Sequence, residues 1–322
     1  MKKVAILKNW GDFWMTDQRF LDQSSNGAGR QGDYQFQVGY DNSCDYLVVL
    51  NRPTAPITTH LPKSNILGLI QEPPNEIYAP LHRGQSAMGT ILNQKYSSEN
   101  GRFILSPPLI PWFVQKSRPE LEELAPFTKV KKLSCVTSKT FFFKGHKKRI
   151  EFLSSIQKKI EGLDTFGRGI HPIKDKWDGL APYEYSIVME NFTCPYYWTE
   201  KIADCFLSWT YPIYFGCTNI HDFFPKNALM RFDMDDPHAT DKIKERIKTP
   251  PTPEEIEAVK ESRELILKKY HFFPSIAHHL DSISSDVPDS QHQTRIRSIT
   301  IPILESWIRS YSRKYMIKIR GK

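Results

Sequence analysis

The apolar residues of this chain gather in short runs that are separated by longer polar or amphipathic stretches. Several runs, such as residues 46–50, are apolar without alternation, which is typical of strands covered on both faces of a sheet. The pattern predicts strands at residues 4–7, 46–50, 66–70, 90–92, 102–105, 133–137, 162–166, 186–189 and 211–215. Because these strands alternate with helical stretches, we expect an α/β fold with parallel sheets built from βα units.

A stretch rich in proline and charge, residues 107–132, interrupts this alternation. Such stretches separate domains, so we predict two Rossmann-like domains, residues 1–125 and 126–290, followed by a terminal segment 291–322. Ligands of open α/β sheets bind beyond the carboxyl ends of the strands. The expected binding site is therefore a cleft in which the two domains face each other.

Two helices are predicted from capping signals. Thr199 precedes an acidic residue and an apolar stripe, which indicates a helix over residues 199–207 with Thr199 as its N-cap. Thr252 opens a capping box with Glu255, and Pro253 occupies the first helical position. This second signal predicts a helix that reaches about residue 270.

Composition narrows the class of protein. Apolar residues make up 39% and charged residues 25%, the balance of a soluble globular chain, and no apolar run reaches the roughly 18–20 residues of a membrane span. The apolar run at residues 4–7 is too short for a signal peptide. The five cysteines lie in apolar stretches, which favours reduced thiols. These observations predict a cytoplasmic protein.

The net charge of +8 comes mainly from residues 295–322, where Glu305 is the only acidic residue. We therefore expect no nucleic-acid partner, since such a partner favours basic residues spread over a folded face. Apolar residues recur at helical spacing over residues 304–315, which predicts a basic amphipathic helix or tail. This segment would bind an anionic membrane surface, or it would pack its apolar stripe on its own domain. The first alternative places the protein on the inner face of the membrane.

The stretch from residue 183 to 216 contains the strongest chemical signal. A predicted strand ends in Glu190-Asn191, and a short loop leads to the predicted helix N-terminus at Thr199. Unpaired backbone N–H groups and the helix dipole favour an anion at such a terminus, and Lys201 adds a full positive charge. These features suit a phosphate or diphosphate.

The same stretch resembles the signature of glycosyltransferase family 10, the α1,3/α1,4-fucosyltransferases. That signature combines an apolar strand, Glu-Asn, Thr-Glu-Lys-Ile and Pro-Ile-Tyr, which recur here as residues 190–191, 199–202 and 212–214 at matching spacing. This sequence departs from the family at Glu184, where a lysine is usual, and at Phe215, where a tryptophan is common.

The resemblance implies a GT-B fold, in which the domain at residues 126–290 binds the nucleotide sugar and the domain at residues 1–125 faces the acceptor. No metal or other obligatory cofactor is implied, so Asp233-Met234-Asp235 is interpreted as an acidic loop rather than a metal motif. Carried over by position, the residues that would bind GDP-fucose are Asn191, Tyr197, Glu200, Lys201 and Arg149. Lys201 and Arg149 would neutralise the diphosphate, although other basic residues of segment 144–148 are alternatives to Arg149.

The resemblance also implies an inverting transfer of L-fucose from GDP-β-L-fucose to a hydroxyl of an acceptor glycan. We expect Glu72, after the predicted strand 66–70, to be the general base, with Glu76 as the alternative. The expected acceptor is an oligosaccharide or lipid-linked glycan containing GlcNAc, joined by an α1,3 linkage in cell-surface polysaccharide synthesis. Two other hypotheses stay open: the protein transfers a sugar from another nucleotide sugar, or it is a catalytically silent glycan- or membrane-binding protein of the same fold.

Overall fold

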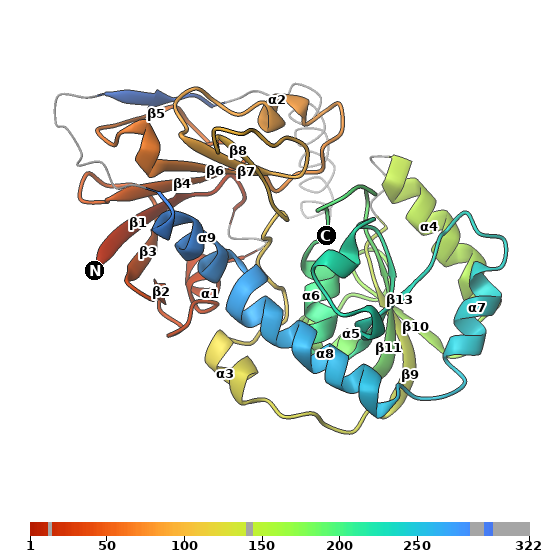
Figure 1. Ribbon diagram of the computed structural model, residues 1–322. Coiled ribbons are helices and arrows are strands. Elements are labelled where there is room, and N and C mark those ends of the chain that lie inside the picture. Colours follow the sequence, from red (N-terminus) through yellow and green to blue (C-terminus); the bar gives the residue numbers. More distant parts are fainter. Residues whose placement is uncertain (12–14, 140–143, 284–292, 299–322) are drawn as a thin grey trace, which may run out of the picture. The chain divides into compact units, whose positions relative to one another are not determined.

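The computed structural model describes residues 1–11, 15–139, 144–283 and 293–298 (Figure 1). Contacts group the chain into two compact units. The larger unit consists of Met1, Gly11–Gln37 and Ser106–Ile283, and the smaller unit of Lys2–Trp10, Val38–Leu105 and Ser284–Lys322. These units differ from the predicted ranges 1–125 and 126–290, whose status as separate domains stays a prediction.

The smaller unit is built on five parallel strands. They are β1 (Lys2–Leu7), β4 (Tyr46–Leu50), β6 (Ile66–Leu69), β7 (Thr90–Asn93) and β8 (Phe103–Leu105), in that spatial order. The register pairs Leu47 with Ile66 and Leu67 with Thr90. Every residue of β4 and β6 is buried, which agrees with the apolar runs from which these strands are predicted.

Two further strands complete the order of this sheet as β2-β3-β1-β4-β6-β7-β8. They are β2 (Arg30–Gln31) and β3 (Tyr34–Val38), which pair antiparallel across a short turn. Short helical segments in the first 125 residues are α1 (Asp17–Leu21), η1 (Lys63–Asn65), α2 (Ala79–His82) and α3 (Arg118–Glu123).

The larger unit contains a five-stranded parallel sheet in the order β10-β9-β11-β12-β13. The strands are β9 (Lys131–Val136), β10 (Leu163–Phe166), β11 (Tyr183–Met189), β12 (Tyr211–Phe215) and β13 (Met230–Arg231). The central strand β11 pairs with β9 and β12, so both of its edges are hydrogen-bonded. The carboxyl end of β11 is therefore the natural centre for a ligand site.

Helices lie on both sides of this sheet. On one side, α5 (Lys176–Leu180) and α6 (Glu200–Leu207) contact β11, and Figure 1 shows α4 (Lys144–Gln157) and α7 (Ala239–Arg246) on the other. The remaining helical elements of this unit are η2 (Ile220–Asp222), η3 (Lys226–Ala228), α8 (Pro253–Leu265), the π-helical turn η4 (Ile266–Tyr270) and α9 (Phe272–Asp281). The core between the helices and the sheet is apolar and contains Ile187, Ile202 and Phe206.

Both predicted helices are confirmed. The Thr199 side chain accepts a hydrogen bond from the backbone N–H of Lys201 at the start of α6. Thr252 and Glu255 form the predicted capping box of α8, and the helical path continues through η4 to Tyr270. In these two segments local capping chemistry agrees with the burial of the apolar stripe.

Part of the predicted tail is a strand rather than a helix. Within segment 291–322, Thr294–Ile296 form β14, which pairs antiparallel with β5 (Ile57–Thr59). Thr294 and Ile296 are buried while Arg295 is exposed, so the period of two characteristic of a strand decides the local structure. The predicted amphipathic helix over residues 304–315 lies outside the described residues. In the described part of the chain, no helix is both long and apolar enough to cross a membrane.

Candidate functional site

Glu190 ties the carboxyl end of β11 to the start of α6. Its side chain is fully buried and accepts hydrogen bonds from the backbone N–H and the hydroxyl of Thr199, both at 2.8 Å. The ammonium of Lys201 lies 3.2 Å from the Glu190 carboxylate. Gly216 makes room for this arrangement, because a Cβ at that position would lie 2.5 Å from Cγ of Glu190. The N-terminus of α6 is thus fixed at the strand end.

A chain of alternating charges continues from Lys201 along α6. Glu200 lies 3.4 Å from the ammonium of Lys201 and 3.4 Å from that of Lys176, and Lys176 lies 2.8 Å from Asp204. Burial by itself raises the pKa of Glu200, but the charges of Lys201 and Lys176 outweigh it and lower that pKa to about 2. Glu200 is therefore ionised at neutral pH.

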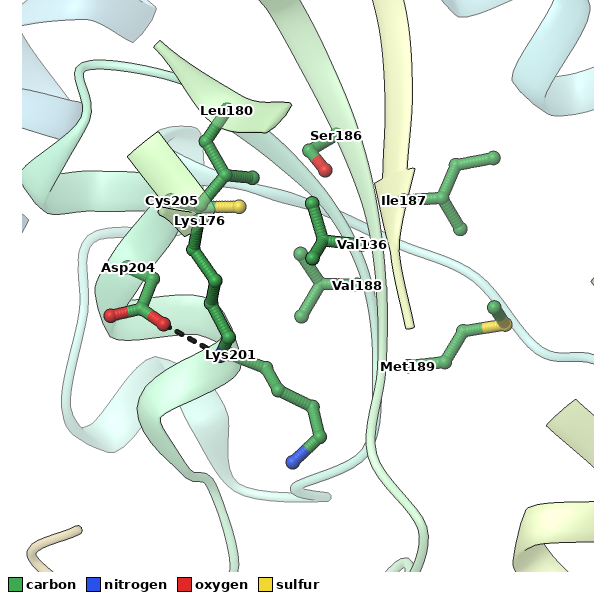
Figure 2. Close-up of a pocket in the computed structure, with 10 residues that line it drawn as sticks. All are labelled: Val136, Lys176, Leu180, Ser186, Ile187, Val188, Met189, Lys201, Asp204 and Cys205. Atoms are coloured by element: carbon green, nitrogen blue, oxygen red, sulfur yellow. Dashed lines mark hydrogen bonds and ion pairs between the residues drawn. The ribbon is translucent and has the colours of Figure 1, made fainter. Parts of the chain in front are cut away.

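Lys201 and Lys176 also line a small cavity beside β11 (Figure 2). Figure 2 shows the Lys176 side chain directed at Asp204 and the Lys201 side chain extending away from the helix. The cavity volume of about 10 Å³ is no more than one water molecule requires. A ligand of nucleotide size therefore does not fit inside this cavity, although the two ammonium groups border it.

Helix α4 brings a third cation to the end of β11. The helix packs so closely on the strand end that a Cβ at Gly145 would lie 1.8 Å from the backbone oxygen of Asn191. One turn later, Arg149 is only 4% exposed, and its Nη1 donates to the backbone oxygen of Met189 at 3.4 Å. Burial lowers the pKa of Arg149, with Cys135 and Glu190 opposing the shift, but a guanidinium remains charged at neutral pH.

The Nε of Arg149 is buried and has no hydrogen-bond partner among the described residues. No carboxylate in the described part of the chain lies within ion-pair distance of Arg149 either, in contrast to Lys201 and Lys176. Leaving a buried charged donor unpaired is costly, so this group calls for a partner that the described residues do not supply.

Asn191 and Tyr197 form the rim of this site. The Tyr197 hydroxyl donates to Oδ1 of Asn191 at 3.0 Å, and Nδ2 of Asn191 lies 3.3 Å from Nε2 of His146. Burial, together with Arg149 and Lys201, lowers the pKa of His146 to about 4, so this imidazole is neutral at pH 7. Its ring can therefore accept a hydrogen bond from the amide of Asn191.

The loop before Tyr197 has an unusual backbone conformation. Tyr196 has a positive φ of 63°, which is disfavoured for a residue with a side chain. Its backbone N–H donates to Oδ1 of Asn219 at 2.8 Å, and its ring packs edge-on against Phe223. These contacts hold the loop in the conformation that buries Tyr197 beside Asn191.

The larger unit therefore brings together the five predicted donor-binding residues Asn191, Tyr197, Glu200, Lys201 and Arg149 around the carboxyl end of β11. Three further residues of this site, to which the sequence analysis assigns no donor-binding role of their own, are Glu190, Lys176 and His146. Glu190 carries a sequence signal, since a carboxylate that directly follows an apolar strand is buried and needs a partner. Lys176 and His146 stand in polar stretches where no pattern distinguishes them.

Glu72 lies in the smaller unit, three residues after the end of β6. The carbonyl oxygen of Glu72 lies 3.0 Å from Nε2 of His82, and the preceding backbone N–H, that of Gln71, donates to Oδ1 of Asn51 at 2.7 Å. Burial raises the pKa of Glu72 to about 7, and a hydrogen bond from Tyr78 opposes the shift. A carboxyl group with this pKa can accept a proton near neutral pH. Glu76, the alternative base, is exposed.

The acidic residues 233–236 are surface groups of the larger unit. Asp235 forms an ion pair with Lys148, and Asp236 lies 2.7 Å from the ammonium of Lys242. These contacts are ion pairs with lysines of the same unit. No cluster of three or more potential metal ligands is present among the described residues.

Two sheets of mainly parallel strands, with a cationic site at the end of a central strand of one of them, define an α/β protein. Residues 128–249 match the sequence model of the glycosyltransferase family 10 (fucosyltransferase) C-terminal domain. The resemblance to family 10 is therefore confirmed for this part of the chain, and the protein is a glycosyltransferase. No curated protein sequence matches the chain.

Solved structures similar to this chain share little sequence identity with it. An α1,3-fucosyltransferase with GDP-fucose is 16% identical, with 84% of this chain and 92% of that one covered and a TM-score of 0.46. A mutant of S. aureus TarM in complex with fondaparinux, α-GlcNAc-glycerol and UDP is 12% identical (74% and 56% covered, TM-score 0.44). Spinosyn forosaminyltransferase SpnP is 9% identical (88% and 98% covered, TM-score 0.43).

Proposed function

We propose that this protein transfers L-fucose from GDP-β-L-fucose to a hydroxyl group of an acceptor glycan, with inversion at the anomeric carbon. The observation that carries the proposal is the guanidinium of Arg149. It is buried beside the end of β11, its Nε lacks a partner among the described residues, and it lies in the family 10 region of the chain. A diphosphate supplies the negative oxygens that such a group requires.

In the proposed reaction, Glu72 accepts the proton of the acceptor hydroxyl. The hydroxyl oxygen forms a bond to the anomeric carbon of fucose while the bond from that carbon to the β-phosphate oxygen breaks. The electron pair of the broken bond stays with GDP, where Arg149, Lys201 and the N-terminus of α6 stabilise the developing charge. The raised pKa of Glu72 supports its role, because a base is most effective when its pKa is near the working pH.

Glu200, Asn191 and Tyr197 would orient the donor. Glu200 is ionised and 13% exposed, so its carboxylate can accept hydrogen bonds from sugar hydroxyls while it keeps contact with Lys201. We propose an acceptor that contains GlcNAc, an α1,3 linkage, and a role in cell-surface polysaccharide synthesis. These finer assignments follow from the resemblance to family 10.

The experiment that tests the proposal is a thermal-shift titration of the full chain with GDP, UDP, ADP and CMP, followed by a transfer assay with GDP-fucose. A nucleotide at 100 times its dissociation constant should stabilise the fold by about 2.7 kcal/mol. We expect GDP to do so selectively and Arg149→Gln to abolish the response. Lys147→Gln is the matched control, because Lys147 is an exposed near neighbour of Arg149 on α4. A selective response to UDP would overturn the fucose assignment.

We also propose that the protein works in the cytoplasm, on the inner face of the membrane, through the basic residues of segment 295–322. The charge of this segment and the apolar spacing of residues 304–315 support the proposal. A truncation after Ser298 retains β14 and removes the predicted helix. We expect this truncation to lose binding to phosphatidylserine vesicles. Unchanged binding would overturn the proposal, and phosphatidylcholine vesicles serve as the control.

A further inference from the structure

Lys176 joins two carboxylates of α6 that would otherwise repel each other. Its ammonium lies 2.8 Å from Oδ2 of Asp204 and 3.4 Å from Oε1 of Glu200. Glu200 and Asp204 are four residues apart on α6, the spacing at which like charges on a helix destabilise it. Lys176 comes from a different helix, α5, and contacts both carboxylates, of which Figure 2 shows Asp204.

The anchor of this arrangement is Asp204, whose side chain is 1% exposed. One of its oxygens accepts from Lys176, and the other accepts from the backbone N–H of Phe113 at 2.8 Å. The ring of Phe113 in turn lies 4.9 Å from the Lys176 ammonium. The position of Lys176 is therefore set by buried groups, while Lys176 itself is 26% exposed. This leaves Glu200 as the group whose orientation depends on Lys176.

Lys201 is affected in turn, because Oε1 of Glu200 lies 3.4 Å from the ammonium groups of both Lys176 and Lys201. With Lys176 present, the charge of Glu200 is shared between two lysines. Without it, Glu200 would pair with Lys201 alone, and Lys201 already contacts the buried Glu190 at 3.2 Å. The positive potential that Lys201 offers to an incoming anion would then be weaker.

We propose that Lys176 is a positioning residue of the donor site, which acts through Glu200 to keep the Lys201 ammonium available to the diphosphate of the donor. This inference rests on the proposed function, since it takes the anion to be the diphosphate of GDP-fucose. Lys176 itself is not required to touch the donor. Its contribution is to divide the charge of Glu200, so its effect must vanish when Lys201 is absent.

A double-mutant cycle on GDP affinity tests this dependence. We expect Lys176→Met to weaken GDP binding about tenfold, because the charge-assisted contact of Lys201 with the diphosphate becomes weaker. In a Lys201→Ala background the same substitution should change GDP affinity less than about twofold, because the ammonium group on which Lys176 acts is absent. Lys176→Arg retains the charge and should restore most of the affinity. Lys174→Met is the matched control, since Lys174 is exposed and two residues away.

Lys176→Met leaves the buried charge of Asp204 without its cation and can destabilise the fold. The variant Lys176→Met/Asp204→Asn removes both charges and keeps an oxygen for the N–H of Phe113, so the same affinity measurement is made on it as well. Equal losses in the wild-type and Lys201→Ala backgrounds, or wild-type affinity in both Lys176 variants, would overturn the inference. If the unaltered chain fails to bind GDP at all, the proposed function fails and the inference fails with it.

Discussion

The ammonium of Lys201 lies 3.2 Å from the carboxylate of Glu190, whose side chain is fully buried where β11 ends. This contact joins a residue of the strand end to a residue of the first turn of α6. Since the same carboxylate also accepts from Thr199, a single buried charge fixes both the helix start and the cation beside it. The binding chemistry of the site and the packing of β11 against α6 therefore depend on the same residue.

Glu190→Gln should lower the free energy of unfolding by about 1–3 kcal/mol, because a buried charge-assisted contact is lost while the side-chain volume is kept. Urea denaturation at pH 7 measures the change. Glu184→Gln is the control from the same strand: Glu184 pairs with Lys132 at the surface, and such pairs contribute less than about 1 kcal/mol. Equal effects of the two substitutions would contradict the structural role given to Glu190.

Glu72→Gln should lower the rate of transfer by about 10²–10⁴-fold, the usual contribution of a general base. In the unaltered protein the rate should rise with pH through about 7, because burial raises the pKa of Glu72 to about 7 and only the ionised form accepts a proton. Initial rates across the neutral range, from acidic to alkaline buffer, measure this profile. Glu76→Gln is the control, and its rate and pH profile should match those of the unaltered enzyme.

The same substitution carries a stability prediction of definite sign. The pKa of Glu72 rises from 4.5 to about 7 on folding, so its contribution to stability is fully present at low pH and is lost as pH rises through about 7. Glu72→Gln should therefore be more stable than the unaltered protein in alkaline buffer, and this difference should shrink as the pH is lowered. If Glu72→Gln is less stable than the unaltered protein in alkaline buffer, ionisation of Glu72 does not lower the stability of the folded state, and the prediction is wrong.

Much of the fold could be predicted from the sequence, because its central strands are continuous apolar runs. The predicted strands 46–50 and 211–215 coincide with β4 and β12. The sequence pattern does not predict β5, β13 or β14, since each has only two or three residues and lies at the edge of its sheet or in a separate pair. Such strands form when a neighbouring strand is already in place, and no sequence period of their own reveals them.

Four of the five predicted donor-binding residues stand in one motif, and Arg149 alone lies outside it. Lys201 and Asn191 lie in the stretch that resembles family 10, so their shared location follows from local sequence. Lys176 reaches Glu200 from another helix, and His146 reaches Asn191 from α4. These contacts depend on how α4 and α5 pack on the sheet, and no local pattern contains that information.

Lys129 caps the C-termini of two helices of the larger unit, α5 and α6. Its ammonium donates to the backbone oxygens of Ala181 and Ser208, both at 2.7 Å, which are the residues that end α5 and α6. Burial lowers the pKa of Lys129 from 10.5 to about 7. Because the pKa is lower in the folded state than in the unfolded state, the contribution of Lys129 to stability should be largest at high pH and be lost as pH falls to about 7.

Lys129→Met should therefore lower the free energy of unfolding more in alkaline than in mildly acidic buffer, with a loss of about 1–3 kcal/mol at the higher pH. Chemical denaturation in the two buffers measures the difference. Lys132→Met is the control, since Lys132 is 42% exposed and its ion pair lies at the surface. A loss for Lys129→Met that is larger in acidic buffer would mean that the charged form of Lys129 is the stabilising one.

Gly145→Ala should damage the donor site without altering any group that carries charge. A Cβ at Gly145 would lie 1.8 Å from the backbone oxygen of Asn191, so either α4 must move away from β11 or the strand end must shift. Both responses displace Arg149 relative to Lys201. We expect a loss of about 1–3 kcal/mol in the free energy of unfolding, as for other overpacked sites, together with a weaker thermal response to GDP.

Ser154→Ala on the exposed side of the same helix is the control for Gly145→Ala, and it should change neither measurement. The informative comparison is between stability and GDP response in the two variants. If Gly145→Ala lowers stability but binds GDP as the unaltered chain does, then Arg149 does not depend on the close packing of α4 on β11. If it weakens both, then the glycine is required because backbone contact at this one point sets the position of the buried guanidinium.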